Sequence, residues 1–204
     1  SRHGSVYKFD YTPGSTDSDG SPWVQDTNFR LTASDFNMGL ESPTSTEYGK
    51  SIAAEGNYIA VGAPRATQGG RSNSGKVYII REDPDAEMRG DGNAFKTEKV
   101  LTVSASSGDE FGKVLAMSNS GKSLAIGAPN SGSSDIGRVF VYRSGTIADD
   151  WRLEATIDPS DGGSSDHFGF SLSFSGSYLA IGAPGHDIAH PTHGFNVHAA
   201  GAAY

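Results

Sequence analysis

The fold of this chain is decided by the stretch Glu47-Tyr-Gly-Lys-Ser-Ile-Ala-Ala-Glu-Gly-Asn-Tyr-Ile-Ala-Val-Gly-Ala-Pro64. It recurs as Glu110-Phe-Gly-Lys-Val-Leu-Ala-Met-Ser-Asn-Ser-Gly-Lys-Ser-Leu-Ala-Ile-Gly-Ala-Pro129 and again as His167-Phe-Gly-Phe-Ser-Leu-Ser-Phe-Ser-Gly-Ser-Tyr-Leu-Ala-Ile-Gly-Ala-Pro184. The second residue of each copy is aromatic and is followed by glycine, and these glycines are 63 and 57 residues apart. Self-similarity at such a period predicts a repeat architecture. The length of the period suits a unit of four strands.

The composition of each copy predicts β-strands. Its apolar runs are short, rich in β-branched and aromatic residues, and bounded by Gly, Ser, Asp and Pro. A glycine stands in the middle of each copy, at Gly56, Gly121 and Gly176, where we expect positive φ in a tight hairpin. We expect an all-β chain with strands near residues 58–62, 76–81, 97–103, 113–118, 123–127, 138–143, 151–157, 170–174 and 178–182.

After Gly-Ala-Pro, each unit continues into a strand that is apolar on both faces. The examples are Gly75-Lys-Val-Tyr-Ile-Ile80 and Gly137-Arg-Val-Phe-Val-Tyr142, and Gly4-Ser-Val-Tyr-Lys-Phe9 opens the chain in the same way. A weaker copy is expected at Gly194-Phe-Asn-Val-His198. A strand buried on both faces fits a sheet stacked between two neighbouring sheets, as in a β-propeller blade.

These motifs resemble the FG-GAP repeat, the blade unit of the integrin alpha-subunit propeller. The resemblance runs from Gly4 to about Gly194, and the aromatic-Gly, Gly-Ala-Pro and Gly-x-Val-aromatic motifs recur in a fixed order. It implies a β-propeller, usually of seven blades, that binds proteins or glycans through loops on one face. It also implies a secreted, cell-surface or luminal location, with cell adhesion among the roles of the family.

The domain organisation that we expect is one propeller segment over residues 1–204. It consists of a partial blade at 4–31, blades at 48–103 and 111–157, and a partial blade with an irregular tail at 168–204. That is about three blades, whereas propellers close with about four to eight. We therefore expect part of a larger propeller, completed by further residues of the polypeptide or capped by a neighbouring chain. A self-closing ring of three blades is the remaining alternative.

One feature departs from the family pattern. Many FG-GAP repeats carry an Asp-x-Asp-x-Asp-Gly calcium loop, and the matching places here hold Glu55-Gly56-Asn57, Ser118-Asn-Ser-Gly-Lys122 and Phe174-Ser-Gly-Ser177. Calcium takes about six to eight oxygen ligands, several of them carboxylates. Only Glu55 offers a carboxylate, so we expect no calcium in these hairpins and no cofactor.

The other polar clusters of the sequence can be explained without a metal or ligand site. The weak metal candidates Asp83, Asp85 and Asp91 share a loop with the integrin-type tripeptide Arg89-Gly90-Asp91, and a solvated turn explains both features. Acids that precede the aromatic-Gly pairs are expected to cap or close turns; they are Asp109, Glu110 and Asp166. Four histidines fall near the end of the chain, which we interpret as clustering without a metal site; they are His186, His190, His193 and His198.

Composition and the absence of known catalytic motifs limit the classes of function that we expect. The net charge of −8 disfavours nucleic acid as a partner. The sequence contains no run of about 20 apolar residues, so we expect no insertion into a membrane. The sequence has no Gly-x-Ser-x-Gly, His-Glu-x-x-His or phosphate-loop motif. We expect a non-enzymatic FG-GAP module for binding or scaffolding, with a protein or glycan ligand. The alternatives are an accessory propeller domain of a larger secreted enzyme and a purely structural subunit of a multiprotein complex. The repeat glycines have expected structural roles; they are Gly49, Gly62, Gly112, Gly127, Gly169 and Gly182.

Overall fold

The computed structural model describes residues 4–14, 20–32, 46–82, 95–145, 150–189 and 196–204. Within these ranges the chain forms antiparallel sheets and no α-helix, and one short 3-10 helix spans Ser133–Asp135. The predicted all-β fold is confirmed. No helix in the described part of the chain is long and apolar enough to cross a membrane.

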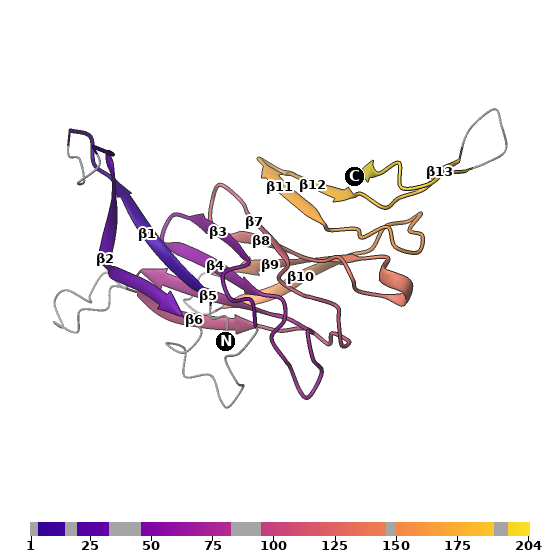
Figure 1. Ribbon diagram of the computed structural model, residues 1–204, viewed down its shortest axis with the longest axis horizontal. Helices are drawn as coiled ribbons and strands as arrows, with labels where there is room; N and C mark the ends of the chain where they lie inside the picture. Colours follow the sequence, from indigo (N-terminus) through magenta and orange to yellow (C-terminus); the bar gives the residue numbers. More distant parts are fainter. Residues whose placement is uncertain (1–3, 15–19, 33–45, 83–94, 146–149, 190–195) are drawn as a thin grey trace.

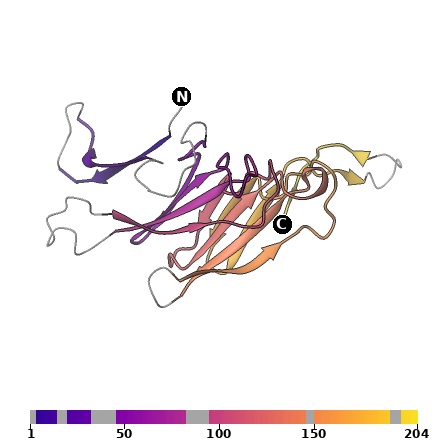
Figure 2. The same ribbon diagram turned by 90° about the horizontal axis from the view of Figure 1, so that it is seen from below.

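Four sheets stack side by side along the long axis of the molecule (Figure 1, Figure 2). The first sheet contains β1 (Ser5–Tyr11) and β2 (Trp23–Thr32). The second sheet contains β3 (Ser51–Glu55), β4 (Tyr58–Ala63), β5 (Lys76–Glu82) and β6 (Phe95–Leu101), paired in that order. The third sheet contains β7 (Val114–Met117), β8 (Ser123–Ala128), β9 (Arg138–Ser144) and β10 (Trp151–Ile157), also in chain order. The sheets do not close into a ring.

The fourth sheet corrects one strand prediction. It contains β11 (Ser171–Ser175), β12 (Tyr178–Ala183) and β15 (Ala202–Ala203). The expected copy at 194–198 does not join it, because β14 (Asn196–Val197) pairs instead with β13 (Ile188–Ala189) in a separate hairpin. Ala203 pairs with Gly182 as Val77 pairs with Gly62, so residues 201–204 are the true copy of residues 75–78. The other predicted strands are present, with ends shifted by a few residues at most.

The three hairpin glycines have the expected conformation. Their φ values are 57° at Gly56, 65° at Gly121 and 56° at Gly176. Only glycine adopts this left-handed region without steric cost, so the glycine in each copy sets the tight connection between its first two strands.

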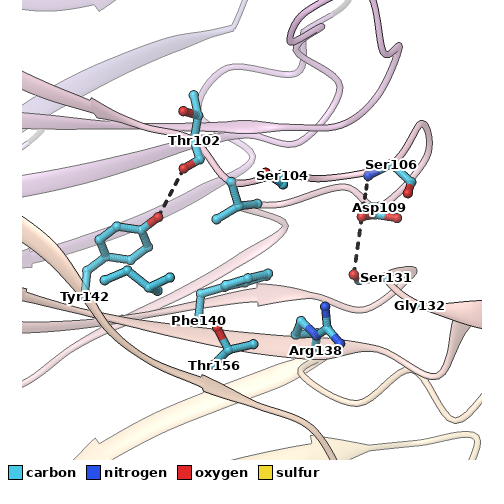
Figure 3. Close-up of a pocket in the computed structure, with 12 residues that line it drawn as sticks. Thr102, Ser104, Ser106, Asp109, Ser131, Gly132, Arg138, Phe140, Tyr142 and Thr156 are labelled. Carbon is cyan, nitrogen blue, oxygen red and sulfur yellow. Dashed lines mark hydrogen bonds between the residues drawn. The ribbon is translucent and has the colours of Figure 1, made fainter.

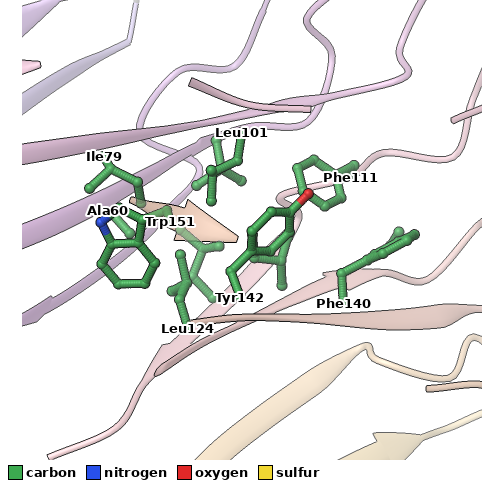
Figure 4. Close-up of a cluster of buried hydrophobic side chains, with 12 residues drawn as sticks. Ala60, Ile79, Leu101, Phe111, Leu124, Phe140, Tyr142 and Trp151 are labelled. Carbon is green, nitrogen blue, oxygen red and sulfur yellow. The ribbon is translucent and has the colours of Figure 1, made fainter. Parts of the chain in front are cut away.

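The largest apolar core lies between the second and third sheets (Figure 4). The rings of Phe111 and Phe140 meet edge to face there, with centroids 5.3 Å apart. Two further cores join the first sheet to the second and the third sheet to the fourth. Val77 and Tyr78, which are neighbours on β5, belong to different cores. The second sheet is therefore buried on both faces, as the apolar pattern of its third strand predicts.

The sheets approach most closely at the Gly-Ala-Pro motifs. A Cβ atom at Gly62 would lie 2.1 Å from the carbonyl oxygen of Gly112 in the next sheet. The same relation joins Gly127 to Gly169, at 2.3 Å. The Ser51 hydroxyl donates a hydrogen bond to the Gly112 carbonyl oxygen, at 2.7 Å. One repeated backbone contact thus sets the step from each sheet to the next.

Candidate functional site

A pocket of about 540 Å³ opens between the second and third sheets (Figure 3). One wall is the segment that follows β6, residues 102–109, and the other is formed by β9 and β10 with the loop after β8. The lining residues are Thr102, Val103, Ser104, Ser106, Asp109, Ser131, Gly132, Arg138, Phe140, Tyr142, Leu153 and Thr156. The pocket therefore forms where the segment that links the second sheet to the third sheet lies over the third sheet.

Hydrogen bonds hold the mouth of the pocket in shape. The Asp109 carboxylate accepts the backbone N–H of Ser106 at 2.8 Å and the hydroxyl of Ser131 at 3.3 Å. The Tyr142 hydroxyl donates to the carbonyl oxygen of Thr102 at 3.2 Å. Burial raises the pKa of Tyr142 to about 12, so this hydroxyl stays protonated at neutral pH and can keep donating.

The positively charged group in the lining, Arg138, is already paired. Arg138 makes a two-pronged contact with Asp158, from Nε to Oδ1 at 2.5 Å and from its terminal nitrogen to Oδ2 at 3.1 Å. Beside the paired Arg138 and the hydrogen-bonded Asp109, the lining offers hydroxyl groups, the aromatic ring of Phe140 and the aliphatic side chain of Leu153. Such a surface suits an uncharged polar ligand that presents both hydrogen-bonding groups and an apolar face.

A second polar cluster lies at the fourth sheet. Asp166 is 2% exposed, and its Oδ2 atom lies 2.8 Å from Nδ1 of His186. The hydrogen bond to this carboxylate raises the pKa of His186. The Tyr204 hydroxyl donates to Asp161 at 2.7 Å, which lowers the pKa of Asp161, while burial and this bond raise the pKa of Tyr204 to about 12. These contacts tie the residues around β15 to the segment between β10 and β11.

The internal repeat explains the position of this cluster. Asp109 and Asp166 occupy the same place, two residues before an aromatic-Gly pair, and Asp166 also accepts the N–H of Gly163 at 2.7 Å. Ser131 and His186 also match each other, two residues after Gly-Ala-Pro. The prediction that acids before the aromatic-Gly pair close turns is confirmed for Asp109 and Asp166, whose carboxylates accept backbone N–H groups. Glu110 instead accepts hydrogen bonds from the side chains of Lys113 and Asn130. The sequence analysis named His186 but did not predict its bond to Asp166, although the equivalent places of Ser131 and His186 in the repeat indicate that bond.

The remaining predicted residues divide into two groups. Asp83, Asp85, Asp91, the Arg89-Gly90-Asp91 tripeptide, His190 and His193 lie outside the described residues. His198 is described, and its Nδ1 atom lies 2.9 Å from Oδ2 of Asp187. Two hydrogen bonds lower the pKa of Asp187: the larger effect comes from the backbone N–H of Ala199 and the smaller from the side chain of His198. Among the residues that the structure describes, no three His, Asp or Glu side chains are grouped so that they could hold a metal ion.

Stacked sheets with a repeated step define an all-β repeat protein. A family model described as the FG-GAP repeat matches residues 23–80 and 151–204, and the chain belongs to the FG-GAP repeat family. Both matches begin at a tryptophan that opens a strand, Trp23 or Trp151, and the second match extends to Tyr204, in agreement with β15 as the third strand of its sheet. FG-GAP repeats are typical of extracellular or luminal proteins. No curated protein matches the chain.

Proposed function

We propose that this chain is a non-catalytic binding module whose ligand, a protein or a glycan, docks in the pocket between the second and third sheets. The observation that carries the proposal is the lining of that pocket, with hydroxyl groups beside an aromatic and an aliphatic side chain. This lining is suited to hydrogen bonding and ring contact.

The chemistry of the lining favours binding over catalysis. General acid–base or nucleophilic catalysis needs a titratable group free to exchange a proton with the substrate. The one carboxylate in the lining, Asp109, is occupied by Ser106 and Ser131, and Arg138 is occupied by Asp158. The lining as described holds no histidine or lysine. The same proposal places the module outside the cell or in an organelle lumen, where FG-GAP repeats are typical.

A matched pair of variants on β10 tests the proposal. Thr156 lines the pocket, whereas the preceding residue of the strand, Ala155, points to the opposite face. We expect Thr156→Arg to block the pocket and remove binding to the proteins or glycans that the wild-type chain captures on an array. Ala155→Arg should bind like the wild type, because it adds the same charge outside the pocket. Equal binding by both variants would contradict the pocket as the site, and turnover of a captured glycan would contradict a non-catalytic role.

A further inference from the structure

Three side chains meet at one end of the hairpin formed by β7 and β8. Lys113 directly precedes β7, and Asn130 follows the end of β8 by two residues. Val114 pairs with Gly127, so the start of β7 and the end of β8 lie at the same end of this hairpin (Figure 1). Lys113 Nζ and Asn130 Nδ2 both donate to a single oxygen atom, Oε2 of Glu110, and the bond from Asn130 is 3.0 Å long. One carboxylate therefore keeps an amine and a carboxamide next to each other.

The backbone fixes the position of the carboxylate that joins them. The N–H of Glu110 donates to the carbonyl oxygen of Asn73 at 3.0 Å, and the carbonyl oxygen of Glu110 accepts the N–H of Lys113 at 3.0 Å. Glu110 has a φ of 55°, a left-handed conformation that persists in a residue other than glycine only where its surroundings hold it. Glu110 is also buried, with 9% of its surface exposed. Groups that are positioned in this way need little further ordering before they can react.

The preceding repeat has a similar cluster without a carboxamide. The matching residues there are Glu47, Lys50 and Arg65. Lys50 Nζ lies 3.6 Å from Oε2 of Glu47, whereas Arg65 Nε lies 3.2 Å from Oε1, so the two cations contact different oxygen atoms. The guanidinium group of Arg65 also has no acyl carbon that an amine could attack. Asn130 differs in both respects, because it carries an acyl carbon and shares one oxygen atom with the amine of Lys113.

We propose that the side chains of Lys113 and Asn130 join in an amide bond, with Glu110 as the group that moves the protons. The carboxylate of Glu110 takes a proton from the ammonium group of Lys113, which makes Nζ a neutral amine and a nucleophile. Nζ attacks Cγ of Asn130, Glu110 passes a proton to Nδ2, and the bond between Cγ and Nδ2 breaks. Lys113 enters as an ammonium group and the nitrogen of Asn130 leaves as ammonium, so atoms and charge balance. The step consumes no oxidant and no other reactant.

The new bond closes residues 113–130, which include the whole β7–β8 hairpin, into a covalent loop. A cross-link between distant residues stabilises a fold mainly because it restricts the unfolded chain. The sequence has no cysteine, so a disulfide cannot supply such a link within the chain. The loop contains Gly127, whose close approach to Gly169 sets the step to the fourth sheet. The amide bond therefore stabilises the hairpin on which the next sheet packs.

Mass spectrometry of the intact, denatured chain tests whether the bond forms. The mass of the wild-type chain should fall below the mass of its sequence by one ammonia molecule. Lys113→Arg should have its full sequence mass, because a guanidinium group keeps the positive charge but does not lose its proton to become a nucleophile. Glu110→Gln should also have its full mass, since an amide does not accept the proton. Lys50→Arg is the matched control in the preceding repeat and should keep the deficit of one ammonia.

A tryptic digest tests where the bond lies. Trypsin should not cleave after Lys113, and the digest should contain a branched peptide that joins the residues around Lys113 to those around Asn130. An ammonia deficit that persists in Lys113→Arg would overturn the proposal, since ring closure at an asparagine alone also releases ammonia. A wild-type chain with its full sequence mass would overturn it as well, and that result does not depend on whether any variant folds.

Discussion

Replacing Gly127 with alanine is expected to destabilise the stack by about 3 kcal/mol, the upper end of the range for overpacked cores. The new Cβ atom would lie 2.3 Å from the carbonyl oxygen of Gly169 and 3.3 Å from its carbonyl carbon. Both atoms are backbone, so they cannot rotate away as a side chain would. The third and fourth sheets must separate locally, which loosens the core between Ala125, Val139 and Phe168.

The assay is thermal unfolding of dilute protein followed by circular dichroism. For a chain of this length, 1 kcal/mol corresponds to roughly 2–4 °C in Tm, so we expect a loss of roughly 6–12 °C. Gly182→Ala is the matched control, because its Cβ atom would meet mainly the hydroxyl of Ser171, which can rotate. It should cost less than about 1 kcal/mol. A Gly127→Ala variant that melts with the wild type, or together with Gly182→Ala, would refute the steric reasoning.

Three other perturbations have defined outcomes. Since the pKa of His186 is raised above its ordinary value of 6.5, its bond to Asp166 adds stability that is fully present below about pH 6.5 and is lost as the pH rises through the folded-state pKa. Denaturant titrations should therefore show His186→Asn losing more stability at pH 5.5 than at pH 8.5. Trp151→Ala should cost about 3–5 kcal/mol in urea unfolding because it leaves a cavity, while Trp23→Ala in the dilute monomer should cost far less. Calorimetric titration with calcium should find no tight site in the hairpins between the first two strands of each unit, where Glu55 is the only carboxylate; a tight site lost in Glu55→Gln would contradict this.

The strands were predictable because their local chemistry agrees with their packing. Runs such as Val77-Tyr-Ile-Ile80 are β-branched or aromatic on both faces, and the structure buries both faces. The hairpin glycines were predictable for a similar reason, since only a tight turn explains a glycine at one place in three copies. The acid at residues 109 and 166 was also readable as a turn-closing group.

The third strand of the fourth sheet was not predictable from residue preferences. Gly201-Ala-Ala-Tyr204 has no β-branched residue, and the longer loop after Gly182-Ala-Pro184 displaces it from the expected spacing. The sequence 194–198 has more of the residue types typical of a strand, yet its described part, Asn196–Val197, pairs with Ile188–Ala189. Register with β12, which depends on the backbone of Gly182 and Ala183, decides between the two segments.

The pocket was not predictable either, because it belongs to no motif. Its lining combines the segment 102–109, the loop around Ser131 and the edge of β9 and β10, which meet only when two sheets stack. The role of Gly127 was predicted only in part. The sequence predicted a structural role for all six repeat glycines, and the structure divides them: Gly49, Gly112 and Gly169 have positive φ, whereas Gly62 and Gly127 allow close approach of the next sheet.

The most direct test of the proposed function is to map where a ligand binds. A protein or glycan captured on the array would be titrated into the isotope-labelled chain and followed by the backbone amide signals in NMR spectra. We expect the largest changes at residues 102–109 and at Ser131 and Gly132, with little change on the first sheet. Changes confined to the first or fourth sheet would contradict a binding site between the second and third sheets.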